Sequence, residues 1–155
     1  YEIIDPVTLY LCETAHLRPA SLPRAQSYCI WEPLHIMREI WAAGGIQEPR
    51  IALMHRVQTP KTALLARSGD TPAGVGFLAL DGEITMLHAV EVLPSYRRRG
   101  VAKKLMAQAA KWAEDHGAKY MALMTTRDNQ AANRLYSSLG MRPVGHYHYR
   151  IKDTA

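Results

Sequence analysis

The stretch HAVEVLPSYRRRGVAKKLM, residues 88–106, contains the transition that decides the fold. Its first part belongs to the run ITMLHAVEVL at 84–93, whose apolar and β-branched residues predict a strand that ends before Pro94. From Val101 to residue 116, apolar residues recur at a period of 3.6. The sequence therefore predicts a strand that passes into an amphipathic helix through a turn rich in arginine.

That turn, Arg97-Arg98-Arg99-Gly100, lies at the N-terminus of the predicted helix, with Lys103 and Lys104 in the first helical turn. A helix N-terminus carries partial positive charge and free N–H groups, so this concentration of cations opposes the helix dipole unless an anion binds there. The glycine lets a phosphate approach the backbone closely. The turn therefore predicts a phosphate site; a solvated basic cluster and a nucleic-acid contact are the alternatives.

Upstream of this turn the sequence predicts an antiparallel meander, because strand-like runs are separated by the turn pairs Gly69-Asp70 and Asp81-Gly82. Downstream, helical and strand patterns alternate. The expected strands are 62–66, 73–80, 84–93, 120–125 and 144–151, and the expected helices are 32–43, 50–57, 101–116 and 129–139. This order predicts an α+β protein with a mixed α/β sheet flanked by helices.

The chain has 155 residues, 48% hydrophobic and 21% charged, which is the composition of one globular domain. It contains no run of about 18 apolar residues, so a transmembrane helix is not expected. Cys12 and Cys29 cannot build a disulfide framework, and without a secretory leader at the start we expect a cytoplasmic protein. A net charge of +5 favours an anionic ligand.

The string at 88–106 resembles the central signature of the GNAT superfamily, the acyl-CoA-dependent N-acyltransferases. The family pattern is Gln or Arg, two residues, Gly, one residue, then Gly or Ala, after a strand with Val-x-Pro. Arg97, Gly100 and Ala102 fit this pattern, as do Val92 and Pro94. NQAANRLYSSLGM at 129–141 is similar to a later family helix. The resemblance implies the GNAT fold, a mostly antiparallel twisted sheet that is splayed at the cofactor.

Residues 1–25 are expected to form an N-terminal extension ahead of one GNAT domain, 26–155. The segment YEIIDPVTLYL at 1–11 has β-branched and aromatic residues around a proline and predicts strand, turn, strand. Residues 18–23 predict a linker. Because YEIIDPVTLYL resembles the terminal strands of another copy of the fold, we interpret the extension as the tail of a preceding module.

The resemblance implies that acetyl-CoA is the co-substrate and that the backbone amides of residues 99–103 hold its pyrophosphate. The pantetheine arm is expected beside the strand, where an N–H near Val92 polarises the thioester carbonyl. The residues expected to contact the cofactor are Val90, Val92, Arg97, Arg98, Arg99, Gly100, Val101, Ala102, Lys103, Asn129 and Asn133.

The predicted helix 129–139 carries two stripes of different character. Asn129, Asn133 and Tyr136 fall within about 60° of one another, and the apolar residues lie on a separate face of the helix. This polar stripe is either a solvent face or the lining of a site. The resemblance implies that both asparagines contact the cofactor and that the Tyr136 hydroxyl lies near the thioester sulfur. There a phenol of pKa about 10 can act as general acid toward a thiolate of pKa about 8.5.

Acyl transfer to an amine needs a neutral nucleophile, because an ammonium of pKa about 10.4 has no free electron pair. His88 and Glu91 are the candidate catalytic bases on the strand. A regular strand sends residues three apart to opposite faces, so both can serve one cleft only if a bulge separates them, as is common in the GNAT pattern. His88 resembles a catalytic histidine of some family members, and its ordinary pKa of about 6.5 suits the role. Glu91, which needs desolvation, and a water chain are the alternatives, as is a core histidine without catalytic role.

The expected activity is transfer of an acetyl group from acetyl-CoA to a primary amine by direct attack in a ternary complex. Neither cysteine lies in a motif for a covalent intermediate. A non-catalytic CoA-binding module and a nucleic-acid binder are the alternatives.

The expected partner is a small-molecule or peptide amine, with no nucleic acid and no membrane. The tyrosines Tyr147 and Tyr149 are compatible with an acceptor pocket, core packing or a homodimer contact. His146 and His148 alternate on one strand face, but no third ligand is evident, and no metal is expected.

Overall fold

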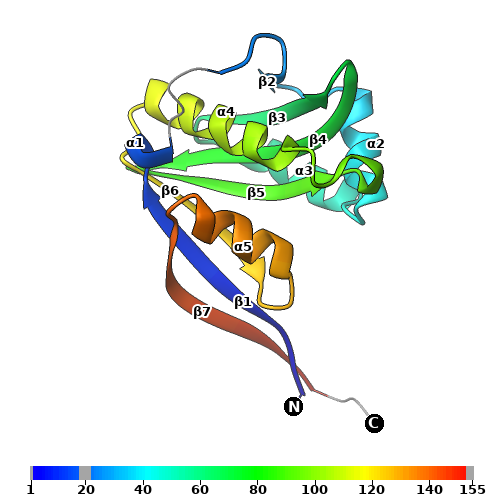
Figure 1. The fold of residues 1–155 in the computed structure, drawn as a ribbon. Helices are drawn as coiled ribbons and strands as arrows, with labels where there is room; N and C mark the ends of the chain where they lie inside the picture. The colour runs from blue at the N-terminus through cyan, green and yellow to red at the C-terminus, as the bar shows by residue number, and fades with distance from the viewer. Residues whose placement is uncertain (1, 18–21, 153–155) are drawn as a thin grey trace.

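The computed structural model describes residues 2–17 and 22–152, and its elements are shown in Figure 1. The strands are β1 (Glu2–Glu13), β2 (Ser27–Ile30), β3 (Lys61–Ser68), β4 (Thr71–Asp81), β5 (Ile84–Val92), β6 (Tyr120–Thr126) and β7 (Arg142–Ile151). The helices are α1 (Thr14–Leu17), α2 (His35–Ala43), α3 (Glu48–Arg56), α4 (Val101–Asp115) and α5 (Gln130–Ser138), with a 3₁₀ turn at Pro94–Tyr96.

Within these residues the strands form one sheet in the order β2-β3-β4-β5-β6-β1-β7. Neighbouring strands run antiparallel except β5 and β6, which are parallel. The mostly antiparallel, mixed sheet with flanking helices confirms the expected α+β class. No helix in the described ranges combines the length and the apolar character needed to cross a bilayer.

Helices cover both faces of the sheet, with α4 and α5 on one face and α2 and α3 on the other (Figure 1). Successive residues of β3 alternate between the two faces: Leu64 and Ala66 pack on the α4 side, whereas Ala63 and Leu65 pack on the α2 side. The central strands β3 and β4 are therefore buried between two apolar layers, whereas β7 at the sheet edge is mostly exposed.

Helix α4 lies close to β4 because Gly74 has no side chain. A Cβ at this position would lie 2.6 Å from Val101 Cγ1 and 3.2 Å from Leu105 Cδ1. Val101 is the first residue of α4 and is buried. This contact therefore fixes where the N-terminal end of α4 sits on the sheet.

Most expected elements are present with shifted ends. The helix expected from residue 32 begins at His35, because Pro33 precedes it and Leu34, its N-cap, has extended backbone. The sequence analysis missed β2 and α1. Residues 18–21 of the expected linker lie outside the described residues.

Residues 2–13 form one strand, β1, in place of the expected strand, turn and strand. A positive φ of 46° at Asp5 and a register shift between Ile4 and Val7 mark an irregularity where the turn was expected. Because β1 pairs with β6 on one side and β7 on the other, the expected extension is part of the sheet. Its interpretation as the tail of a preceding module stays a prediction.

Gly74→Ala is expected to lower the free energy of unfolding by about 1–3 kcal/mol, because the new methyl group overlaps Val101 in a packed core. Urea denaturation measures this change. Gly145→Ala is the matched control on another strand, since its Cβ would meet Leu9 Cδ2 at 3.8 Å, an ordinary contact. Equal stability of the two variants would contradict the close packing of α4 against β4.

Candidate functional site

Strands β5 and β6 pair only at their beginnings. Ile84–Leu87 of β5 pairs with Tyr120–Leu123 of β6, and beyond these residues the two strands no longer form a ladder. The splay expected from the sequence is therefore present. Val90 and Val92 lie on β5 beyond the paired region, and their side chains pack in the α4-side core.

Strand β5 carries a bulge in its second half. Between His88 and Glu91 it has two residues where β4 has one, Gly76. The first of the two, Ala89, has a positive φ of 53°, in the left-handed region that non-glycine residues rarely adopt. The bulge that the sequence analysis named as the condition for both candidate bases to share one face is therefore present.

The bulge places His88 and Glu91 on the face that α2 and α3 cover. The His88 ring centroid lies 6.3 Å from that of Phe77, a core residue of this face. The Glu91 side chain lies against Gly44 at the end of α2, where an added Cβ would overlap the Glu91 carboxyl carbon. Two titratable groups of β5 thus lie on the face whose core residues are apolar.

Burial shifts the pKa of both groups toward their neutral forms. The pKa of His88 is lowered by burial and, to a lesser degree, by the charge of Arg50. The pKa of Glu91 is raised by burial, while Arg97 and Arg50 act in the opposite direction. At neutral pH the His88 imidazole is therefore uncharged and able to accept a proton.

The N-terminus of α4 has free backbone donors. Gly100 has a φ of 77°, and the space where its Cβ would stand is open. No side chain in the described part of the chain caps this end, and its first turn contains no acidic residue. The first intrahelical bond runs from the Lys104 N–H to the Gly100 carbonyl, so the amides of residues 101–103 point out of the helix end. These residues fit an anionic group such as the CoA pyrophosphate.

The three arginines before this end are exposed at the surface. Arg97 Nε donates to the Val92 carbonyl at 3.4 Å, and the Arg99 guanidinium lies 5.4 Å from the centroid of the Tyr96 ring. Arg98 has a positive φ of 63° in the turn. These cations lie together in the turn between β5 and α4, and their contact with phosphates stays a prediction.

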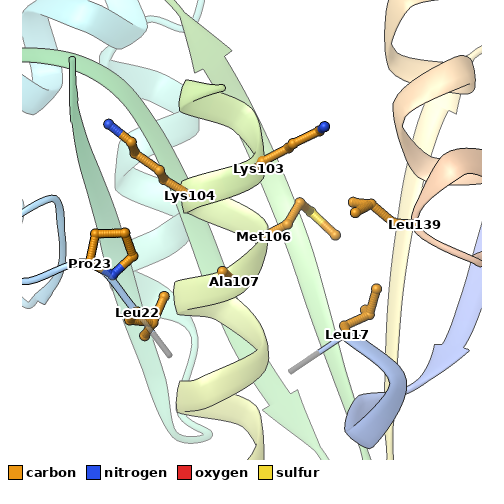
Figure 2. A pocket seen from close by; sticks show the side chains of 8 residues that line it. All are labelled: Leu17, Leu22, Pro23, Lys103, Lys104, Met106, Ala107 and Leu139. Atoms are coloured by element: carbon orange, nitrogen blue, oxygen red, sulfur yellow. The ribbon is translucent and has the colours of Figure 1, made fainter. Parts of the chain in front are cut away.

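Lys103 and Lys104 border a pocket of about 350 Å³ along α4. Figure 2 shows the two side chains leaving the helix in different directions. Lys104 Nζ donates to Gln26 Oε1 and to the Arg67 carbonyl, both at 2.8 Å. This lysine therefore links α4 to the segment before β2 and to the end of β3. Lys103 is exposed near the helix N-terminus, which is compatible with its expected role beside the cofactor.

The side chains of Asn129 and Asn133 bond within the protein. Asn129 Oδ1 accepts the Ala132 N–H at 3.1 Å and caps α5. Asn133 Nδ2 donates to the Thr126 carbonyl at 3.0 Å, and Asn133 Oδ1 accepts the Tyr10 hydroxyl at 2.7 Å. These bonds hold the start of α5 against β6 and β1, and a contact of either asparagine with a cofactor stays a prediction.

Tyr136 is buried in the α4-side core, with its ring centroid 5.8 Å from that of Tyr10. Burial raises the pKa of Tyr136 to about 12. The phenol is therefore protonated at neutral pH and available as a donor. At this pKa it yields its proton less readily than an ordinary tyrosine of pKa about 10.

The two histidines of β7 have partners on their own or the next strand. His146 Nδ1 lies 3.3 Å from Thr8 Oγ1, and His148 Nε2 accepts from Arg150 Nε at 3.1 Å. Across the described ranges, no group of three or more His, Cys, Asp or Glu side chains is arranged to hold a metal ion.

Sequence reasoning missed three residues that contact the bulged segment or act on its titratable groups. Trp41 Nε1 donates to the carbonyl of Ala89 at 2.8 Å. Gly44 lies directly after the expected helix 32–43, and Arg50 begins the expected helix 50–57, but neither was given a role at the site. The pair Gly44-Gly45 was the one available signal, since a single glycine suffices to end a helix.

The model of the Acetyltransferase (GNAT) family matches residues 29–141. The chain belongs to this family. The match spans both segments on which the resemblance rested, the strand-to-helix turn and the helix that carries Tyr136.

Similar proteins include acetyltransferases of small molecules. Over 57 residues the chain is 37% identical to aminoglycoside N(6')-acetyltransferase type 1 of Salmonella typhimurium, covering 37% of this chain and 39% of that enzyme. Over 141 residues it is 28% identical to the enzyme of the same name in Acinetobacter haemolyticus, covering 82% and 90%. The first curated relatives are covered over only 27% to 39% of their own length.

A solved structure shares the fold. AAC(6')-Iy in complex with the bisubstrate analogue CoA-S-monomethyl-acetylneamine superposes with a TM-score of 0.62 at 20% identity, covering 83% of this chain and 97% of that chain.

Gly100→Glu is expected to weaken CoA binding by about tenfold or more, because a carboxylate at this position repels phosphate. Isothermal titration calorimetry with CoA measures the dissociation constant. Gly117→Glu is the matched control at the other end of α4: its φ is 78° against 77° at Gly100, and both positions have open space for a Cβ. The two substitutions therefore carry the same backbone strain, and equal CoA affinities would contradict the phosphate site.

Proposed function

We propose that this GNAT protein transfers an acetyl group from acetyl-CoA to a primary amine of a small molecule or peptide, by direct attack in a ternary complex. The observation that carries the proposal is the meeting of two features at β5. The uncapped N-terminus of α4 follows the end of this strand, and the bulge brings His88 and Glu91 to one face of it.

The donor side is formed by α4 and the free edge of β5. The amides of residues 101–103 bind the pyrophosphate, and the arginines before them neutralise its charge. Leu93 donates its N–H to the Ala73 carbonyl of β4, so by strand alternation the N–H of Val92 points away from β4, toward the splay. In this proposal the Val92 N–H donates to the acyl oxygen of the bound thioester. When bound, acetyl-CoA supplies the thioester.

The acceptor side is formed by His88 and Glu91. The neutral imidazole of His88 removes a proton from the incoming amine, directly or through a water molecule. The Glu91 carboxylate attracts the ammonium form before that step. Tyr136, which stays protonated, donates to the sulfur that leaves.

The matching aminoglycoside acetyltransferases support a small-molecule amine as acceptor. The experiment is a thiol-release screen with acetyl-CoA against aminoglycosides, polyamines, amino acids and peptides with free N-termini or lysines. Release of CoA thiol with at least one class, and acetylated amine by mass spectrometry, is the expected result. Tight CoA binding with no acetylation in the whole panel would instead favour a non-catalytic CoA-binding module.

The pH profile of kcat/KM identifies the base. Because the pKa of His88 is lowered, its neutral form persists below the ordinary value of about 6.5, so the acid limb of the wild-type profile is expected below that pH. His88→Gln should lower kcat/KM by about 100-fold and remove this limb. His35→Gln, at an exposed histidine on α2, is the control. Loss of the limb in Glu91→Gln but not in His88→Gln would move the role to Glu91.

Tyr136→Phe is expected to lower kcat by about tenfold or more while the dissociation constant of CoA stays within about twofold. Steady-state kinetics and calorimetry separate the two quantities. Tyr10→Phe removes a hydroxyl from the same aromatic contact and should lower stability by about 1 kcal/mol without a comparable fall in kcat. Parallel losses of kcat and CoA affinity in Tyr136→Phe would indicate a packing role.

A further inference from the structure

The bulge of β5 is held from outside the sheet by one side chain. Trp41 of α2 is fully buried, and its indole N–H donates to the Ala89 carbonyl at 2.8 Å. Ala89 is the residue with positive φ in the bulge. The indole therefore binds the backbone at the point where β5 departs from regular strand geometry.

The same helix also contacts the residue at the far side of the bulge. Gly44, three residues after Trp41, lies against the Glu91 side chain, and no Cβ could be placed there without overlap. Residues three apart share one face of a helix. Trp41 of α2 and Gly44, the C-cap of this helix, thus contact the bulged segment at its backbone and at the Glu91 side chain.

These contacts compensate an unfavourable backbone. A non-glycine residue in the left-handed region is strained, and a bulge takes backbone groups out of the ladder. A buried carbonyl that loses its donor is costly as well. A regular strand would return Glu91 to the opposite face, among the apolar residues under α4, and would separate it from His88.

We propose that Trp41 is a positioning residue: its indole N–H holds the Ala89 carbonyl and thereby keeps His88 and Glu91 on the same face of the sheet. Its effect on turnover rests on the proposed acetyl transfer. Its effect on the shape of β5 does not.

The test compares Trp41→Phe with Trp112→Phe, each in the full chain. Trp112 is also buried, but on α4, where it stacks on His116. With the amine found in the screen, Trp41→Phe should lower kcat by about 10- to 100-fold and leave the dissociation constant of CoA within about twofold. Trp112→Phe should leave kcat within about twofold. An equal effect of the two variants on kcat overturns the proposal.

Rescue separates positioning from general packing. Glycine adopts a positive φ without strain, so Ala89→Gly needs less support from the indole. In the Trp41→Phe background, Ala89→Gly should recover about fivefold or more of the lost kcat, whereas it should recover nothing in Trp112→Phe. Absence of recovery in the Trp41→Phe background counts against the proposal.

If Trp41→Phe does not fold, benzothienylalanine at position 41 keeps the shape of the indole and replaces its N–H by sulfur. This variant should reproduce the fall in kcat, and wild-type kcat in it overturns the proposal.

NMR tests the geometry without any acetyl donor. In Trp41→Phe or the benzothienylalanine variant, the backbone amide signals of residues 88–92 should move well beyond their shifts in Trp112→Phe. Unchanged signals overturn the proposal. Moved signals in a protein that acetylates no amine in the panel would refute the proposed function while supporting the positioning role of Trp41.

Discussion

Two residues of β5 stand opposite one residue of β4, and the arrangement of polar groups in this sheet depends on that surplus residue. Side chains of a strand alternate with a period of two, so a carboxylate three residues after a histidine belongs on the opposite face. The bulge cancels this alternation once. The α4 face of β5 keeps the apolar Val90 and Val92 for helix packing, while the α2 face receives both titratable groups.

Two glycines of β4 connect this arrangement to the candidate anion site at the N-terminus of α4. Gly76 lies opposite the bulge, and an added Cβ would stand 3.3 Å from Leu87 Cδ1. Gly74 lets Val101 approach the sheet, which brings the free amides of the α4 N-terminus to the end of β5. A strand with larger residues at both positions would displace α4 and crowd β5. The geometry of the proposed donor and acceptor sides therefore depends on the missing side chains of β4 as much as on the polar residues of β5.

The sequence predicted the parts of this site that depend on local pattern. The strand-to-helix turn, the glycine at the helix start and the amphipathic α4 follow from residues adjacent in the chain. The sequence predicted the bulge only as a condition, because nothing near Ala89 signals a positive φ. The side chain that holds the Ala89 carbonyl, Trp41, lies 48 positions away in the chain. The place of β1 between β6 and β7 was missed for the same reason, since pairing partners more than 100 residues apart leave no periodic trace. For Asn129 and Asn133 the sequence predicted the shared polar stripe but not its contacts. Asn129 caps α5, and Asn133 accepts the Tyr10 hydroxyl.

Burial on the α2 face has opposite consequences for the two candidate bases. It lowers the pKa of His88, which leaves an imidazole that is neutral and ready to accept a proton at physiological pH. It raises the pKa of Glu91, which favours the protonated carboxyl, a form without basic capacity. Arg97 and Arg50 counteract this shift and favour the carboxylate of Glu91. In the proposed mechanism, this low-polarity layer prepares His88 for proton transfer, whereas Glu91 needs the neighbouring arginines to retain the charge that would attract an ammonium group. This division of roles requires both groups on one face, and that is the condition the bulge fulfils.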